Sequence, residues 1–197
     1  MVVLDTNAGK AVNYLKGEAD DELTGHPMPD KIFQDIVDQI ENFYQEHGYE
    51  LGWRFLTCSK TVLKSNPKIA FITLNPGGSR IRHDHPPPSC EEGSPYLDES
   101  WGGKKPGESK LQIQIQKMFG KIHEKVNYPG SEHELIESTL SGHFVPFRSP
   151  NLENLENKKE AFDFGERIWS EILTSVQPRL FVCINLNFHP EQADFAS

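Results

Sequence analysis

The sequence predicts an α/β domain in which parallel strands are layered against helices. Two short apolar runs bounded by chain breakers, at 69–74 and 179–185, are typical of strands buried on both faces. Segments with apolar residues at helical spacing lie before, between and next to these runs, at 30–46, 109–122 and 158–176. Strands that alternate with helices in this way indicate a layered sheet with right-handed crossovers.

The N-terminal part is predicted to differ from the rest of the chain. Residues 1–29 are polar, rich in Gly, Asp and Glu, and without clear periodicity, so we expect a flexible N-terminal arm. Residues 30–197 are long enough for a single α/β domain with a substantial core. Its first helix is predicted to begin at Asp30 and to stop before Gly48, a residue type that suits the position after a helix.

The first predicted strand, 69–74, runs into the turn Asn75-Pro76-Gly77-Gly78. Proline fixes φ, and the two glycines let a ligand approach the backbone closely. Binding sites in α/β sheets form beyond the carboxyl ends of strands, which favours a functional site here. A simple type II turn, with proline second and glycine third, is the alternative.

The long segment 80–108 is rich in proline, glycine and charge, which is typical of functional or disordered loops. Tyr96 and Trp101 could stack on a base or anchor this loop to the domain. His83 and His85 have the spacing of a ligand pair, but no Cys and no further His–Glu pair at ligand spacing accompanies them. We therefore expect no metal site.

The second half of the domain supplies the remaining elements. Ser109 is predicted to cap a helix, and a shorter helix is predicted at 132–140. The run 142–147 is interpreted as a short strand. The last helix, 158–176, is predicted to end before Pro178.

Polar residues near the second predicted strand are candidates for ligand contacts. Arg148 could bind a phosphate or form a structural ion pair. His143 could recognise a base or satisfy a backbone group. The net charge of −9 counts against an extended phosphate contact, although a local basic patch is compatible with it. The candidate nucleic-acid contacts are Arg80, Arg82, Arg148 and Ser149.

Three ordered segments resemble the uracil-DNA glycosylase superfamily, in particular its mismatch-specific and single-strand-selective branches. The run 72–78, with letters ITLNPGG, is similar to the first motif of that superfamily, in which a strand ends in an Asn-Pro-Gly loop. The runs 144–150 and 177–184 are similar to its second and third strands. The resemblance implies a three-layer α/β/α fold with a short central parallel sheet.

The resemblance also implies a role for each matching residue. Asn75 would hold the water that attacks the anomeric carbon, while fixed dipoles stabilise the departing base. The partner would be DNA with a modified or mismatched base, the reaction would be N-glycosidic hydrolysis in base excision, and no cofactor is expected. The base pocket would consist of Pro76, Gly77, Gly78, His143 and Phe144.

Departures from the family pattern favour an alternative function. Ser141-Gly142-His143 stands where the family has a base-reading asparagine, and the family's last strand and last motif are expected to be missing. The alternative is a catalytically inactive interaction protein that keeps the glycosylase-like fold. A shortened sheet would expose a strand edge, which the N-terminal arm or a second copy in a homodimer could cover.

The remaining sequence features narrow the class of protein. Three scattered cysteines match neither a disulfide framework nor a metal-binding spacing, which is typical of a reduced, cytoplasmic protein. No apolar run approaches the ~20 residues of a membrane helix, so no membrane association is expected. Walker, Gly-x-Gly-x-x-Gly and Gly-x-Ser-x-Gly motifs are missing from the sequence.

Overall fold

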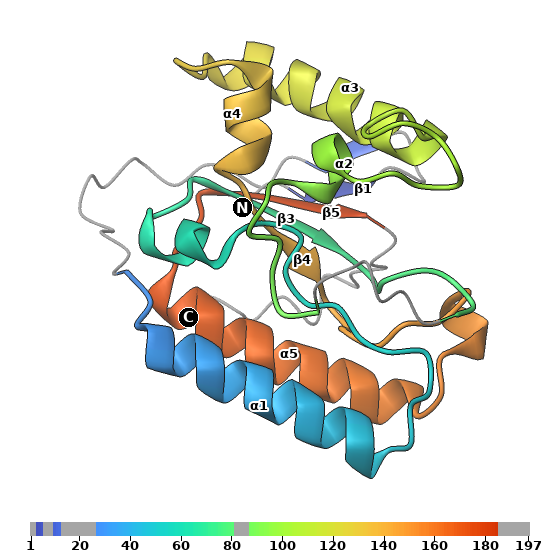
Figure 1. Cartoon of the computed structure of the whole chain (residues 1–197). Coiled ribbons are helices and arrows are strands. Elements are labelled where there is room, and N and C mark those ends of the chain that lie inside the picture. Colours follow the sequence, from blue (N-terminus) through green and yellow to red (C-terminus); the bar gives the residue numbers. More distant parts are fainter. Residues whose placement is uncertain (1–2, 6–9, 13–26, 81–86, 185–197) are drawn as a thin grey trace.

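The computed structural model describes residues 3–5, 10–12, 27–80 and 87–184. Its central feature is a parallel sheet with strand order β4-β3-β5 (Figure 1). A separate antiparallel pair, β1 and β2, lies in the N-terminal arm, and β1 contacts β5. The strands are β1 (Val3–Asp5), β2 (Lys10–Val12), β3 (Ile69–Thr73), β4 (Leu140–His143) and β5 (Leu180–Ile184).

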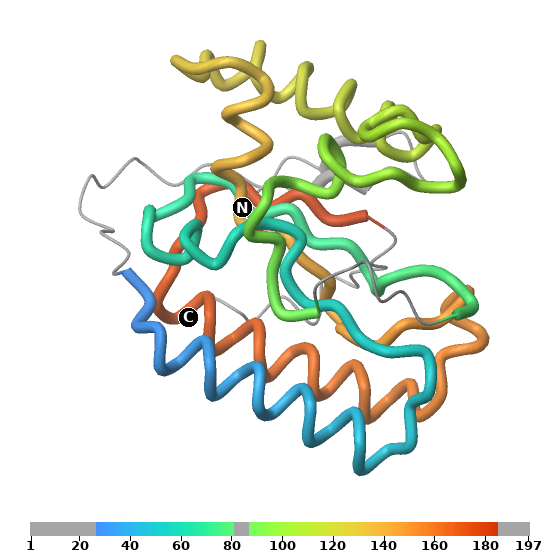
Figure 2. The backbone as a smooth tube through the Cα atoms, viewed as in Figure 1, coloured from blue at the N-terminus to red at the C-terminus, as the bar shows by residue number. Residues whose placement is uncertain are grey.

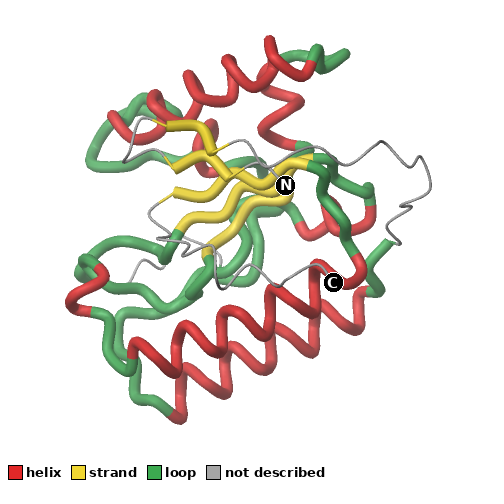
Figure 3. Tube along the Cα trace, turned by 180° about the vertical axis from the view of Figure 1, so that it is seen from behind, coloured by secondary structure: helices red, strands yellow, loops and turns green. Residues whose placement is uncertain are grey.

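Helices cover both faces of the parallel sheet. One face carries α1 and α5, and the other carries α2, α3 and α4, as the views from opposite sides in Figures 1 and 3 show. The predicted layering of helices on an α/β sheet is therefore confirmed. The helices are α1 (Asp30–Glu46), α2 (Pro95–Asp98), α3 (Lys110–Val126), α4 (Glu132–Glu137) and α5 (Lys158–Ser175), with 3-10 turns η1 (Lys60–Lys64) and η2 (Leu152–Asn154).

Strand β3 is the buried centre of these layers. Successive side chains of a strand point to opposite faces. Accordingly, Ala70 and Ile72 belong to the core under α1 and α5, while Ile69 and Phe71 belong to the core under α2, α3 and α4. Because both faces are buried from Ile69 to Ile72, these four positions are apolar, which confirms the interpretation of this run.

Local signals set the helix ends as predicted. Gly48 follows α1 with φ +67°, a left-handed conformation that glycine adopts without strain. Ser109 accepts a hydrogen bond from the N–H of Gln112, whose side chain accepts one from the N–H of Ser109 in return. Ser131 and Glu134 form the same capping box at α4.

The strand predicted at 142–147 is placed too late in the chain: β4 is Leu140–His143, which overlaps the prediction only at Gly142 and His143. The β3 pairing sets this register, with Thr73 opposite His143. Pro146 has no N–H for a ladder, and Gly142 allows β4 to lie close to α5. The predicted helix 132–140 is correspondingly shorter because its last residues belong to β4 and the turn before it.

The segment 53–57, called the extended segment below, covers the outer edge of β4. His143 N–H donates to the Phe55 carbonyl at 2.9 Å, and Thr57 N–H donates to the Ser141 carbonyl at 2.8 Å. These bonds satisfy backbone groups that would otherwise be exposed at a sheet edge. Met28, just before α1, is part of the domain core. Its side chain is buried, and its N–H donates to the Leu63 carbonyl at 3.1 Å. The homodimer through a sheet edge stays a prediction.

Within the part of the chain that the structure describes, no helix has both the length and the apolar character that a membrane span requires.

Replacement of Gly142 by alanine is expected to destabilise the fold. The added Cβ would lie 2.9 Å from the Phe55 carbonyl oxygen and 3.0 Å from the Trp169 ring. Overpacking of this kind costs about 2 kcal/mol, measured as the loss of unfolding free energy in urea. Gly77→Ala is the control, because a Cβ there meets no atom within 4 Å. Equal stability of Gly142→Ala and the wild type would contradict the close approach.

Candidate functional site

The turn after β3 and the loop after β4 meet at one edge of the sheet. Phe144 N–H donates to the Thr73 carbonyl at 2.7 Å, and Ser149 N–H donates to the Pro76 carbonyl at 3.3 Å. Figure 2 shows the two stretches running side by side. This is the carboxyl edge of the parallel strands, where ligands bind in α/β sheets.

The side-chain amide of Asn75 is fixed by the second loop. Its Nδ2 donates to Ser149 Oγ at 2.9 Å and lies 3.3 Å from the carbonyl oxygens of Phe147 and Pro76. An amide nitrogen has two protons, and all three neighbours here accept hydrogen bonds. The contacts therefore identify the NH2 end of the amide and direct Oδ1 away from these three oxygens.

Arg148 contacts both glycines of the turn. Its Nη1 donates to the Gly77 carbonyl and lies 3.4 Å from the position that a Cβ on Gly78 would take. Gly78 has φ +109°, a conformation that side chains rarely adopt. Arg148 is only 8% exposed, so its guanidinium has a structural contact within the protein. Its predicted contact with phosphate stays a prediction.

His143 lies at the end of β4, beside Thr73. Its Nδ1 and Thr73 Oγ1 share a hydrogen bond of 2.7 Å, and the residue is 9% exposed. Burial, together with the positive charges of Arg54 and Arg148, holds the pKa of the imidazole well below its usual range. The ring is neutral at pH 7, a state in which one nitrogen donates and the other accepts.

The other predicted site residues lie in different surroundings. Phe144 packs its ring against Phe162 of α5, with 5.7 Å between ring centroids, whereas His143 pairs with Thr73. Arg80 is exposed beyond the turn, and Arg82 lies outside the described residues. The structure thus joins Asn75 and the glycines to the second loop, while the Phe144 ring belongs to the packing on α5.

A buried ion pair next to the site was missed from the sequence. Arg54, which is 3% exposed, donates from both terminal nitrogens to the Glu99 carboxylate and from Nη2 to Cys90 Sγ at 2.8 Å. Trp101 Nε1 donates to the same carboxylate at 2.8 Å. The available signal was a single arginine within the apolar run 53–56. A charge in such a run requires a partner.

The aromatic residues of the long loop anchor it to the domain. Tyr96 is buried and packs edge-on against Phe71 of β3 and against Trp101. Trp101 is also held by its hydrogen bond to Glu99. Of the two alternatives left open by the sequence, these contacts favour anchoring over stacking on a base.

The three thiols are free and buried. Burial raises the pKa of Cys58 and of Cys183 to about 12, so both stay protonated at neutral pH and are poor nucleophiles. Among the described residues, no group of three Cys, His, Asp or Glu side chains could hold a metal ion. The pair His83 and His85 lies outside the described part of the chain.

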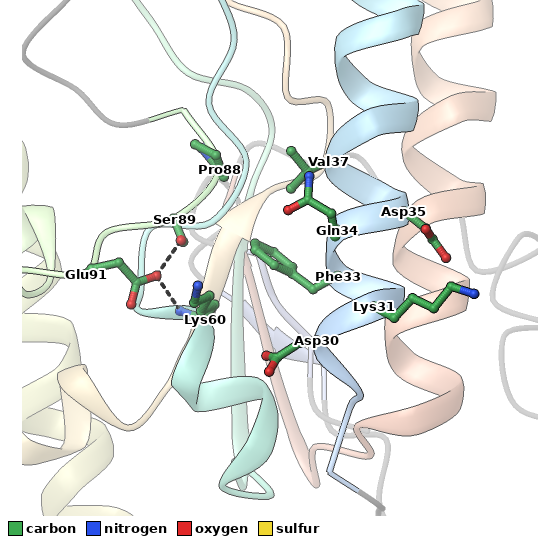
Figure 4. A pocket seen from close by; sticks show the side chains of 10 residues that line it. All are labelled: Asp30, Lys31, Phe33, Gln34, Asp35, Val37, Lys60, Pro88, Ser89 and Glu91. Carbon is green, nitrogen blue, oxygen red and sulfur yellow. Dashed lines mark hydrogen bonds between the residues drawn. The ribbon is translucent and has the colours of Figure 1, made fainter.

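An open hollow of about 490 Å³ lies between α1, η1 and the segment 87–91 (Figure 4). Glu91 is held at its rim by the hydroxyls of Ser59 and Ser89 and by the N–H of Lys60. None of the predicted site residues lines it. The lining residues are Asp30, Lys31, Phe33, Gln34, Asp35, Val37, Lys60, Pro88, Ser89 and Glu91.

No protein-family model matches this chain, and neither curated proteins nor solved structures give a significant match. The glycosylase resemblance therefore depends on the ordered motifs alone and stays a prediction.

The neutral His143 is expected to make the fold sensitive to acid. Its pKa is lower in the folded than in the unfolded state, so below pH 6.5 the unfolded chain takes up the proton first. The unfolding free energy should then fall by about 1.4 kcal/mol per pH unit from this group alone. Urea denaturation from pH 7.5 to 5.0 should show a shallower decline in His143→Gln. An equally shallow decline in the exposed control His133→Gln would contradict this assignment.

Loss of one partner of the buried ion pair is expected to be severe. Glu99→Ala leaves the Arg54 guanidinium buried without its carboxylate, which costs about 3 kcal/mol of unfolding free energy. The double variant Arg54→Met, Glu99→Leu removes both charges and should be more stable than Glu99→Ala by urea denaturation. A single variant as stable as the wild type would show that the pair is not needed.

Proposed function

We propose that this chain is a uracil-DNA glycosylase-like protein that binds a nucleobase of DNA and hydrolyses its N-glycosidic bond. The observation that carries the proposal is the fixed amide of Asn75 at the carboxyl edge of the sheet. By the resemblance, this amide would correspond to the position at which the uracil-DNA glycosylase superfamily holds its attacking water. A superfamily-type three-layer fold is part of the same proposal.

In the proposed reaction, Asn75 orients the nucleophile. Oδ1 is a hydrogen-bond acceptor, so it binds a water through one O–H and leaves a lone pair of the water free. Attack on the anomeric carbon forms the new C–O bond while the C–N bond breaks, and the base leaves as an anion with the bonding electron pair. The proton that the attacking water loses passes to the solvent, because an amide oxygen orients the water but is too weak a base to accept the proton. Correct placement of the water removes much of the entropic cost of this step.

The neighbouring groups suit a departing base anion. Gly77 is exposed, and a Cβ there would meet no atom within 4 Å, so the turn leaves space for a ring close to the backbone. The Arg148 guanidinium lies beside Gly78 and provides a fixed positive charge. Charge held in place before the reaction stabilises an anion without reorganisation.

A non-enzymatic interaction protein is the second candidate. The burial of Arg148 and His143, at 8% and 9% exposure, favours it, because both side chains already have partners inside the protein. The net charge of −9 also favours it over a tight DNA binder. In this candidate, the turn after β3 and the loop after β4 stabilise the scaffold.

Base excision distinguishes the two candidates. Single- and double-stranded oligonucleotides containing uracil are incubated with the protein, and released base and abasic sites are measured. Asn75→Ala should lower the excision rate about 100-fold, because the water loses its acceptor. Asn42→Ala, at an exposed asparagine of α1, is the matched control and should keep the wild-type rate.

Two results would contradict the enzymatic proposal. Excision that survives Asn75→Ala would show that this amide does not hold the water. Absence of both excision and a mobility shift of DNA at low salt would favour the interaction protein instead.

A further inference from the structure

The Asn75 amide is the first donor in a chain of hydrogen bonds that runs into η2. Asn75 Nδ2 donates to Ser149 Oγ at 2.9 Å, and Ser149 Oγ donates to the Asn151 carbonyl at 2.8 Å. Asn151 is held in turn, because its Oδ1 accepts from the N–H of Asn154 at 2.9 Å and caps η2.

The direction of this chain is fixed by its last member. A backbone carbonyl accepts hydrogen bonds and cannot donate, so the single proton of the Ser149 hydroxyl is used on Asn151. Ser149 Oγ can then only accept from Asn75. With the amide flipped, Asn75 Oδ1 would face Ser149 Oγ and the two carbonyl oxygens of Phe147 and Pro76 without a proton between them.

Burial makes this preference strong. Ser149 is 2% exposed, so bulk water does not replace its contact with the Asn75 amide. Hydrogen bonds that form in such surroundings are costly to lose. The two carbonyl contacts of Nδ2, at 3.3 Å, are longer than the 2.9 Å contact to Ser149.

We infer that Ser149 is a positioning residue that selects one orientation of the Asn75 amide, so that the site presents a hydrogen-bond acceptor to its ligand. The group recognised by Oδ1 is then a donor: a water, a ring imino N–H or an exocyclic amine. A ligand edge with only carbonyl oxygens is not recognised by this atom. The catalytic consequence rests on the proposed function, whereas the orientation of the amide does not.

NMR of the full chain tests the orientation without any substrate. The side-chain NH2 signals of Asn75, identified by their loss in Asn75→Ala, should exchange slowly with solvent in the wild type. In Ser149→Ala, their exchange should be about tenfold faster, since one buried hydrogen bond is lost. Ser79→Ala, at an exposed serine of the same turn, should leave the exchange unchanged.

Two further measurements separate positioning from general destabilisation. Backbone amides of β3 should keep their protection in Ser149→Ala, and Ser149→Thr, which restores a hydroxyl, should restore slow exchange of the Asn75 NH2. If Ser149→Ala does not fold, the same comparison between Ser149→Thr and Ser149→Cys decides, because a thiol is a weaker acceptor than a hydroxyl. Equal exchange of the Asn75 NH2 with and without the hydroxyl would overturn the inference.

Excision kinetics give the second readout. On a single-stranded oligonucleotide containing uracil, Ser149→Ala should lower kcat about tenfold with little change in KM, because the water and not the substrate is misplaced. If the wild type releases no base, the proposed function fails and the NMR result still decides on Ser149. If the wild type is active but Ser149→Ala keeps its kcat, the positioning role is overturned.

Discussion

Enclosure of β3 on all four sides is the constraint on which the rest of the structure depends. The strand pairs with β4 along one edge and with β5 along the other, and helices cover both faces. Its side chains from Ile69 to Ile72 are buried, so none of these positions can carry an unpaired polar group. The first polar side chains, those of Thr73 and Asn75, occur where this enclosure ends. The place of the candidate site thus follows from the packing of the strand before it.

The buried polar side chains near this edge of the sheet carry more positive than negative charge unless one of them is neutral. Two guanidinium groups, of Arg54 and Arg148, lie near the buried imidazole of His143. The protein keeps the imidazole neutral and places the Glu99 carboxylate against Arg54. Because these groups are buried, each depends on its neighbours more than an exposed ion pair does. The ion pair between Glu99 and Arg54 also links the long loop to the extended segment beside β4, and Trp101 of the same loop donates to that carboxylate.

The sequence predicted the elements whose signals are local. The apolar run of β3, the cap at Ser109 and the glycine after α1 each specify a structure by their own chemistry. Strand β4 was misplaced because its residues, Leu-Ser-Gly-His, look like a loop, and only pairing with β3 makes them a strand. Asn75 could be singled out from its turn, but the role of Ser149 depends on a contact across 74 residues. Such a contact leaves no pattern in a single sequence.

The hydrogen bonds that join the turn after β3 to the loop after β4 have a dynamic consequence. N–H groups of Phe144, Val145 and Ser149 are bound to carbonyls of the other stretch, and the side chains of Asn75 and Arg148 cross between the two. Opening of either stretch would break the hydrogen bonds that join it to the other. We therefore expect the two stretches to unfold locally as one cooperative unit, with the same free energy of opening. Neither the turn after β3 nor the loop after β4 can therefore open alone as a lid. A ligand has to reach Asn75 either through a joint motion of both stretches or from a direction that neither of them covers.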